Sequence, residues 1–166
     1  MSPLDAALLL PATLAIGIWV AWSDMKFMKI PNSAVLALAG IWLIFGLLLM
    51  PLSIWAAGIG LGAAMLVMGF FAALIRFFGA GDAKFIAAMA PFFVQSNPRF
   101  VLVLAAAVFL AAFAAHRLAK RVSVIRRHSQ DWQSWHDADF PMGFALAGIL
   151  NIYIIMRALP LFLPQS

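Results

Sequence analysis

Long apolar stretches alternate with short polar connections along this chain. Five of the stretches hold 16 to 24 residues, which suits tilted or slightly short transmembrane helices, because about 20 residues cross the hydrocarbon core. A shorter one contains Pro91 and cannot cross alone as a regular helix, so it either extends into the polar residues after it or is partly re-entrant. The pattern predicts an all-α membrane protein with six transmembrane helices. The stretches cover residues 6–22, 33–50, 52–75, 85–94, 100–115 and 140–159.

The composition supports a membrane protein. The chain has 166 residues, of which 66% are hydrophobic and 10% are charged, against about 45–50% and about 25% in soluble domains. This excludes a water-soluble globule, a disordered tail and a nucleic-acid-binding domain. We expect one membrane-embedded domain over residues 1–166, with no room for a separate soluble domain. Cysteine is absent, which excludes disulfides, thiolate metal sites and cysteine nucleophiles.

The basic residues predict the orientation. The formal net charge is +5, and the positive-inside rule explains this excess in a membrane protein without any nucleic acid. Only Arg99 and Arg157 fall on one side of the predicted spans. We therefore expect the opposite side to face the cytoplasm and both termini to lie outside. That side carries Lys26, Lys29, Arg76, Lys84, Arg117, Lys120, Arg121, Arg126 and Arg127.

Two of the six acidic residues, all of which are aspartates, stand out. Asp24 and Asp82 each lie at the predicted cytoplasmic mouth of a span, in a short loop, where an ionisable group beside hydrocarbon is a functional candidate. We expect Asn32 or Ser33 to cap the second span, and Asp82 to be the N-cap of the fourth. The other four aspartates lie at the outer terminus or in the polar loop 116–139, where a charged residue is ordinary. They are Asp5, Asp131, Asp137 and Asp139.

If the first and fourth spans pack together, Asp24 and Asp82 converge. Two carboxylates that share one proton can activate water while donating to a carbonyl, as in aspartic proteases. Asp82 at a helix N-terminus favours the anion, and Asp24 at a helix C-terminus disfavours it, which predicts that Asp24 holds the shared proton. Taken separately, an aspartate before a helix is usually a cap, and one in a loop among lysines is usually a solvated charge.

Three local sequences give these residues a more specific context. Asp24 is followed after five residues by Ile30-Pro31-Asn32. Asp82 stands in Gly79-Ala80-Gly81-Asp82-Ala83-Lys84, and Pro141-Met142-Gly143 opens the last span. With these motifs the chain resembles the prepilin peptidases, a family of membrane aspartic proteases with a GxGDxK signature that also includes preflagellin peptidases. Because it lacks paired CxxC motifs, the chain resembles the short, peptidase-only kind of enzyme associated with tight-adherence (Flp-type) pili. No methyltransferase activity is therefore expected.

The resemblance implies a mechanism and a location. Asp24 and Asp82 would be catalytic, without metal or cofactor, in a multi-pass protein of the bacterial inner membrane that cuts leaders at the cytoplasmic side. The implied partners are prepilin-like precursors, membrane lipids and other pilus-assembly components, and no nucleic acid. Supporting roles in the motifs would fall to Ile30, Pro31, Asn32, Gly79, Gly81, Lys84, Pro141 and Gly143.

Two other classes of function stay open at this stage. A small cation- or proton-coupled transporter could bind cations with the two aspartates, although transporter sites usually lie near the midplane. A non-catalytic pilus-assembly protein would tolerate the loss of both acids. The spacing of His116, His128 and His136 fits no usual zinc site, and loop 116–139 has no assigned role.

Overall fold

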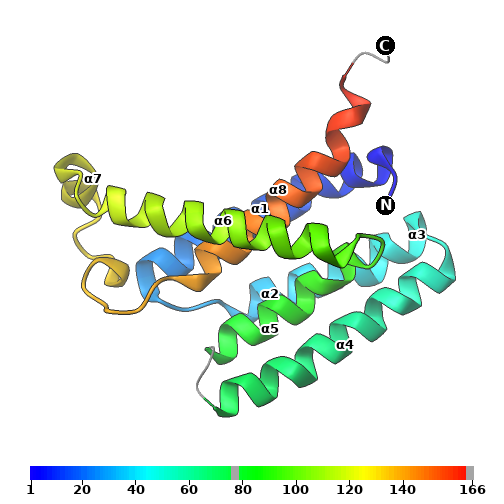
Figure 1. Ribbon diagram of the computed structural model, residues 1–166, viewed down its shortest axis with the longest axis horizontal. Helices are drawn as coiled ribbons and strands as arrows, with labels where there is room; N and C mark the ends of the chain where they lie inside the picture. The colour runs from blue at the N-terminus through cyan, green and yellow to red at the C-terminus, as the bar shows by residue number, and fades with distance from the viewer. Residues whose placement is uncertain (76–78, 164–166) are drawn as a thin grey trace.

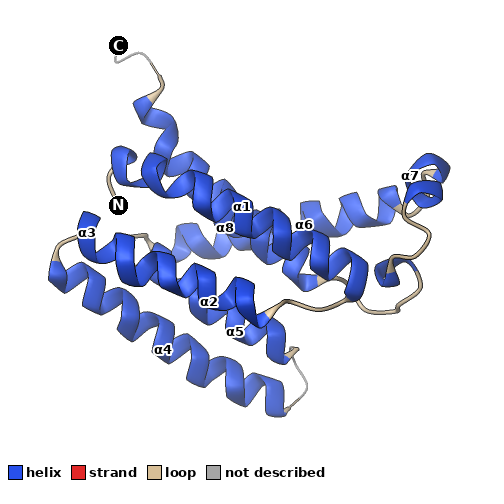
Figure 2. Ribbon diagram, turned by 180° about the vertical axis from the view of Figure 1, so that it is seen from behind, coloured by secondary structure: helices blue, strands red, loops and turns tan. Residues whose placement is uncertain are grey.

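The computed structural model describes residues 1–75 and 79–163, and within these residues the ordered elements are all helical (Figures 1 and 2). The shorter elements include a π-helical turn, η1 (Trp42–Gly46), and three 3-10 turns, η2 (Ala90–Phe93), η3 (Gln133–Trp135) and η4 (Leu159–Leu161). The α-helices are α1 (Pro3–Phe27), α2 (Asn32–Ile41), α3 (Leu47–Leu49), α4 (Leu52–Leu74), α5 (Ala80–Met89), α6 (Pro98–Ala119), α7 (Ser123–His128) and α8 (Met142–Ala158). The all-α prediction is confirmed.

Five helical stretches are long and apolar enough to cross a membrane. Each corresponds to one of the stretches predicted from the sequence, with boundaries that differ by a few residues. The helices of the first and fifth predicted stretches extend beyond them at both ends, because polar residues continue these helices at their termini. The polar connection after the fifth stretch begins only beyond Ala119, and it contains the short helix α7. The five are Pro3–Phe27, Asn32–Leu49, Leu52–Leu74, Pro98–Ala119 and Met142–Leu161.

The fourth predicted stretch forms a short interior helix. Helix α5 begins five residues before the predicted start, and η2 continues it to Phe93. Their combined rise is about 23 Å, less than the roughly 30 Å hydrocarbon core. The segment packs against α2, α4 and α8, and Phe85 and Phe92 are almost completely buried. Protein thus replaces lipid around most of this segment.

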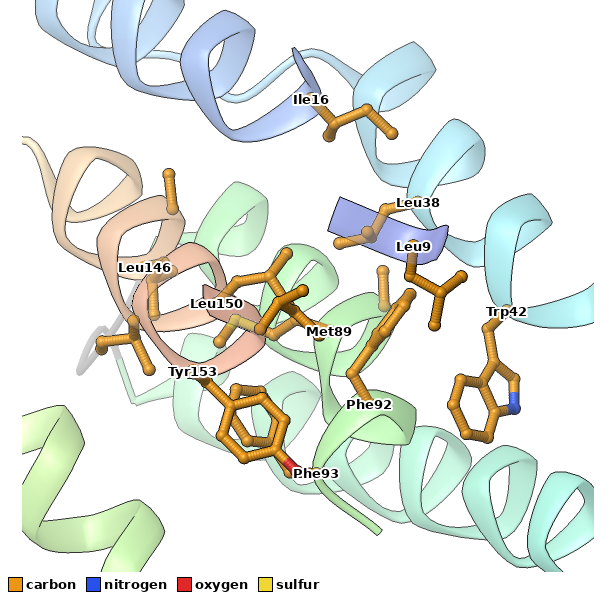
Figure 3. Close-up of a cluster of buried hydrophobic side chains, with 14 of the residues drawn as sticks. Leu9, Ile16, Leu38, Trp42, Met89, Phe92, Phe93, Leu146, Leu150 and Tyr153 are labelled. Atoms are coloured by element: carbon orange, nitrogen blue, oxygen red, sulfur yellow. The ribbon is translucent and has the colours of Figure 1, made fainter. Parts of the chain in front are cut away.

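Helix α8 is at the centre of the bundle. It runs along α1 and also contacts α5 and α6; α1 and α8 lie side by side in both views (Figures 1 and 2). The sequence offered packing of the first span against the fourth as a condition for the two aspartates to converge; in the structure α1 packs along α8 instead. The core joins side chains from segments far apart in the chain, among them Leu9, Leu38, Phe92, Leu150 and Tyr153 (Figure 3).

Glycines in α4 allow close packing within the chain. A Cβ atom at Gly58 would lie 2.4 Å from Cζ2 of Trp42, and one at Gly62 would lie 3.0 Å from the carbonyl oxygen of Ala87. Small residues let membrane helices approach in this way. Trp42 is held further by a 3.3 Å hydrogen bond from Nε1 to the carbonyl oxygen of Trp55.

The helices alternate in direction, so one end of the bundle gathers three connections (Figure 1). These are the α1–α2 connection, the neighbouring ends of α4 and α5, and the segment that carries α7. Both termini lie toward the opposite end. The basic residues predicted to face the cytoplasm lie at the end that gathers the three connections, apart from Arg76, which lies outside the described residues. The cytoplasmic placement of this end stays a prediction.

Candidate functional site

Asp24 lies in the last turn of α1, not in a loop as expected. The helix continues to Phe27 and stops where Met28 adopts a left-handed conformation, with φ of 51°. The Asp24 side chain is 4% exposed. Its Oδ2 accepts hydrogen bonds from the backbone N–H groups of Gly143, at 2.7 Å, and Phe144, at 3.4 Å. The carboxylate is therefore fixed by the start of α8.

Pro141 and Gly143 make this contact possible. Pro141 is the N-cap residue of α8 and has no side chain that could cap the helix, so the first backbone N–H groups of α8, which have no partner within the helix, are available to Asp24. A Cβ atom at Gly143 would lie 3.0 Å from Cγ of Asp24. The N-terminus of α8 favours an anion at this position. The dipole argument from the sequence considered only the end of α1, and α8 supplies an opposing contribution.

Asp82 lies in the first turn of α5. The helix starts at Ala80, so Asp82 is the third helical residue rather than the N-cap, and Gly79 is the N-cap. Oδ2 of Asp82 accepts a 3.2 Å hydrogen bond from the backbone N–H of Gly79. Burial raises the pKa of the Asp82 carboxyl, and the hydrogen bond from Gly79 acts in the opposite direction. The protonated form is therefore more accessible than in a solvated aspartate.

Both carboxylates line one cavity of about 830 Å3, which we call the two-aspartate cavity. Its volume lies within the usual range for small-ligand sites. Asp24 enters from α1 and Asp82 from α5, while α8 packs against both helices. The convergence predicted from the sequence is thus observed, although the helix that organises it is α8. Lys29 and Lys84 also line this cavity.

The Ile-Pro-Asn motif connects the two carboxylate segments. Ile30 lies between two glycines, since a Cβ at Gly81 would be 3.5 Å from its Cβ and one at Gly143 would be 2.9 Å from its Cδ1. Pro31 immediately precedes α2 as its N-cap residue. Asn32 is the first helical residue rather than the cap, and Ser33 follows it within the helix. Oδ1 of Asn32 instead accepts a 3.2 Å hydrogen bond from Nζ of Lys84.

Sequence reasoning missed part of the cavity wall. Asp137, Asp139, Phe109 and Phe140 also line it, and the rings of Phe109 and Phe140 lie 5.3 Å apart. The only sequence signal for the two acids was their position just before Pro141. The polar loop after α6 is therefore adjacent to the site.

Two contacts hold this loop against the helices. Nζ of Lys26 pairs with Oδ2 of Asp131 at 3.1 Å, and the ring of Trp135 stacks on His116 with centroids 5.2 Å apart. His128 and His136 use ring nitrogens to contact backbone carbonyls within the loop. Among the described residues, no three His or Asp side chains come together in a way that could hold a metal ion.

The described fold and site define a polytopic helical membrane protein with a carboxylate pair at one end of its bundle. A model of the type IV leader peptidase family matches residues 11–115. The match spans well over half of the chain and includes Asp24 and Asp82, so the chain belongs to this family of proteases. No curated protein and no solved structure matches the sequence. The resemblance inferred from the motifs is therefore confirmed at the level of the family.

Proposed function

We propose that this protein is an aspartic endopeptidase that removes the leader from prepilin-like precursors at the cytoplasmic face of the membrane. The observation that carries the proposal is the convergence of Asp24 and Asp82 in one cavity from different helices. The family membership supports leader peptidase activity. The lack of cysteine supports assignment to the peptidase-only kind that serves tight-adherence pili, without methyl transfer.

In the proposed mechanism the two carboxylates share one proton. The ionised carboxylate takes a proton from a water molecule as the water oxygen attacks the scissile carbonyl carbon. The protonated carboxyl donates its proton to the carbonyl oxygen. On collapse of the tetrahedral diol, the carboxyl that took the proton from water passes it to the leaving amine, and the other carboxylate takes a proton back from a hydroxyl of the diol. The pair again holds one proton, and no acyl-enzyme forms. The apparent pKa values belong to the pair rather than to either residue.

The surroundings suit the two carboxylates to this chemistry. The N–H groups of Gly143 and Phe144 fix one oxygen of Asp24, so the carboxylate is oriented before substrate arrives. Asp82 is partly buried and burial raises its pKa, which favours retention of a proton by the pair to a higher pH than in a solvated aspartate. The positive-inside rule supports placing this end of the bundle in the cytoplasm.

The test is cleavage of a prepilin by the purified chain in liposomes. Asp24→Asn and Asp82→Asn should each lower kcat/KM by at least about 100-fold, because an amide can neither take nor relay the proton. Asp131→Asn is the matched control, since Asp131 is at the same end of the bundle and outside the cavity. Full cleavage by either cavity variant would exclude the proposed mechanism, and uncut prepilin with wild-type protein would exclude the proposed function.

A further inference from the structure

An apolar groove lies beside the two-aspartate cavity. The groove has a volume of about 620 Å3 and runs between α2 with η1 on one side and α4 on the other, over α5 and η2. Helix α5 contacts both α2 and α4 and lies between them in the ribbon views (Figures 1 and 2). Except for Asn32 and Lys84, the lining residues are apolar.

The groove and the cavity meet at these two polar residues. Asn32 and Lys84 line both spaces, and they are joined by the hydrogen bond from Nζ of Lys84 to Oδ1 of Asn32. From Asn32 the groove follows the second span as far as Leu43, a distance of about 16 Å at helical rise. A ligand that lies in the groove therefore has one end beside Asp82 and the other within the membrane.

The walls and the floor of the groove are built differently. Leu36, Leu43 and Leu66 stand along its sides and are 70%, 48% and 48% exposed, so the described residues leave about half or more of each side chain uncovered. The floor contains the small residues Ala87 and Ala88. Small residues at a membrane interface allow a second helix backbone to approach closely. These features fit an apolar α-helix about three turns long.

We propose that the groove binds the apolar helix of the precursor, the segment that continues beyond the cleaved bond into the membrane. This proposal rests on the proposed function, because it gives that helix a location that brings the adjoining peptide bond to the aspartates. A helix docked there would pass from hydrocarbon to the polar cavity at Asn32 and Lys84. The extended cleavage segment would lie beyond them, between Asp24 and Asp82.

A second copy of the chain is disfavoured as the occupant. The glycines of α4 that could pair with a partner helix, Gly58 and Gly62, already face Trp42 and Ala87 of the same chain. A lipid acyl chain could occupy apolar space on any lipid-facing surface, and it has no need of continuity with a polar cavity. Both occupants are outcomes of the test below.

The first experiment fills the groove. Ala63 lines the groove, whereas the neighbouring Ala64 is exposed and lies outside it. We compare Ala63→Trp with Ala64→Trp on two substrates, namely a prepilin and the same leader and cleavage segment joined to a soluble carrier without the apolar helix. Ala63→Trp should lower the ratio of kcat/KM for the prepilin over the carrier fusion at least tenfold, mainly through KM. Ala64→Trp should leave that ratio unchanged.

The second experiment identifies the occupant directly. A photo-crosslinking benzoylphenylalanine replaces Leu66 in the groove, or Val103 on the lipid-facing side of α6 as the control. Both are placed in the inactive Asp82→Asn protein with prepilin in liposomes. We expect a crosslink from position 66, and not 103, to the apolar helix of the prepilin.

The outcomes separate this inference from the proposed function. Crosslinks from position 66 only to lipid, or to a second copy of the chain, would reject the groove as the docking site. The same conclusion would follow if Ala63→Trp and Ala64→Trp cut prepilin equally well. Failure of the wild-type protein to cut prepilin at all would instead reject the proposed function.

Discussion

The backbone N–H of Gly143 donates a 2.7 Å hydrogen bond to Oδ2 of Asp24, which joins residues 119 positions apart in the sequence. This contact places the start of the last membrane helix directly against a proposed catalytic carboxylate. The weakest of the three sequence motifs, Pro141-Met142-Gly143, thereby becomes part of the site. Its role is to orient Asp24.

Substitution of Gly143 by alanine tests this role. The new Cβ would lie 2.9 Å from Cδ1 of Ile30 and 3.0 Å from Cγ of Asp24. Ile30 can adjust, but movement of the carboxylate misplaces a reacting group, and misplacements of about 1 Å can cost about 100-fold in rate. We expect Gly143→Ala to lower kcat at least tenfold in a prepilin cleavage assay. Gly148→Ala, on the same helix and packed against Val108, should retain activity; equal losses would indicate a general packing defect.

The two glycines of the GxGDxK motif should respond differently to alanine. A Cβ at Gly79 would lie 2.8 Å from Oδ2 of Asp82, whereas one at Gly81 would make ordinary contact with Ile30 at 3.5 Å. We expect Gly79→Ala to reduce cleavage at least tenfold and Gly81→Ala to reduce it less than about threefold. Initial rates of prepilin processing at matched protein levels provide the measurement. A larger loss for Gly81→Ala would contradict the geometry.

The pKa of Asp82 leads to a prediction about the pH dependence of cleavage. Burial raises this pKa above the ordinary value of 3.8, and the mechanism needs one ionised carboxylate. The acid limb of the profile of kcat/KM against pH should therefore lie above pH 3.8. Measurement in a constant-ionic-strength buffer series checks this, and full activity maintained at pH 4 would contradict it.

The same pKa shift predicts how stability changes with pH. Because the folded pKa of Asp82 is raised, its contribution to stability is complete below the unfolded pKa and is lost as pH rises through the folded value. Asp82→Asn should therefore reduce the fall in Tm between pH 4 and pH 7. Asp131 is the control of opposite sign, since the hydrogen bond from Lys26 lowers its pKa. The contribution of Asp131 therefore changes mainly below the ordinary value of 3.8, and Asp131→Asn should leave the Tm difference between pH 4 and pH 7 nearly unchanged, as followed by scanning fluorimetry in detergent.

Alanine substitutions at two nearby glycines of α4 distinguish the effect of side-chain packing from that of helix propensity. A Cβ at Gly58 would overlap the buried ring of Trp42, whereas a Cβ at Gly60 would meet no neighbouring atom within 4 Å. We expect Gly58→Ala to lower the free energy of unfolding by about 1–3 kcal/mol through overpacking. Gly60→Ala should leave it unchanged or raise it by up to about 1 kcal/mol. Denaturation of both variants in mixed micelles is the check, and equal effects would argue against the Trp42 contact.

The absence of cysteine allows a direct test of orientation. Ser53→Cys and Ser123→Cys introduce single thiols at exposed positions, near the two opposite ends of the bundle. In intact cells a membrane-impermeant maleimide should label position 53 and leave position 123 unlabelled until the membrane is opened. The reverse labelling would place the two-aspartate cavity outside the cytoplasm and would contradict the proposed side of cleavage.

The apolar pattern identified the transmembrane helices because crossing hydrocarbon requires a length of apolar residues that few other structures share. It was less accurate at helix ends, because polar residues such as Asp24 and Asp82 belong to helical turns that lie beyond the apolar stretch. Helix boundaries depend on backbone hydrogen bonds, such as the one from Met28 to the carbonyl oxygen of Asp24. Asp24 and Asp82 consequently moved from predicted loops into helical turns.

The sequence by itself determined the helical membrane architecture, the family and the two candidate carboxylates, because length, hydropathy and local motifs are properties of contiguous residues. Only the tertiary structure decided that α8 organises the site, that Gly143 orients Asp24 and that Asn32 meets Lys84. It also revealed Asp137 and Asp139 in the cavity wall and the apolar groove beside it. These features depend on which helices become neighbours, and that choice follows from the packing of side chains between segments far apart in the chain.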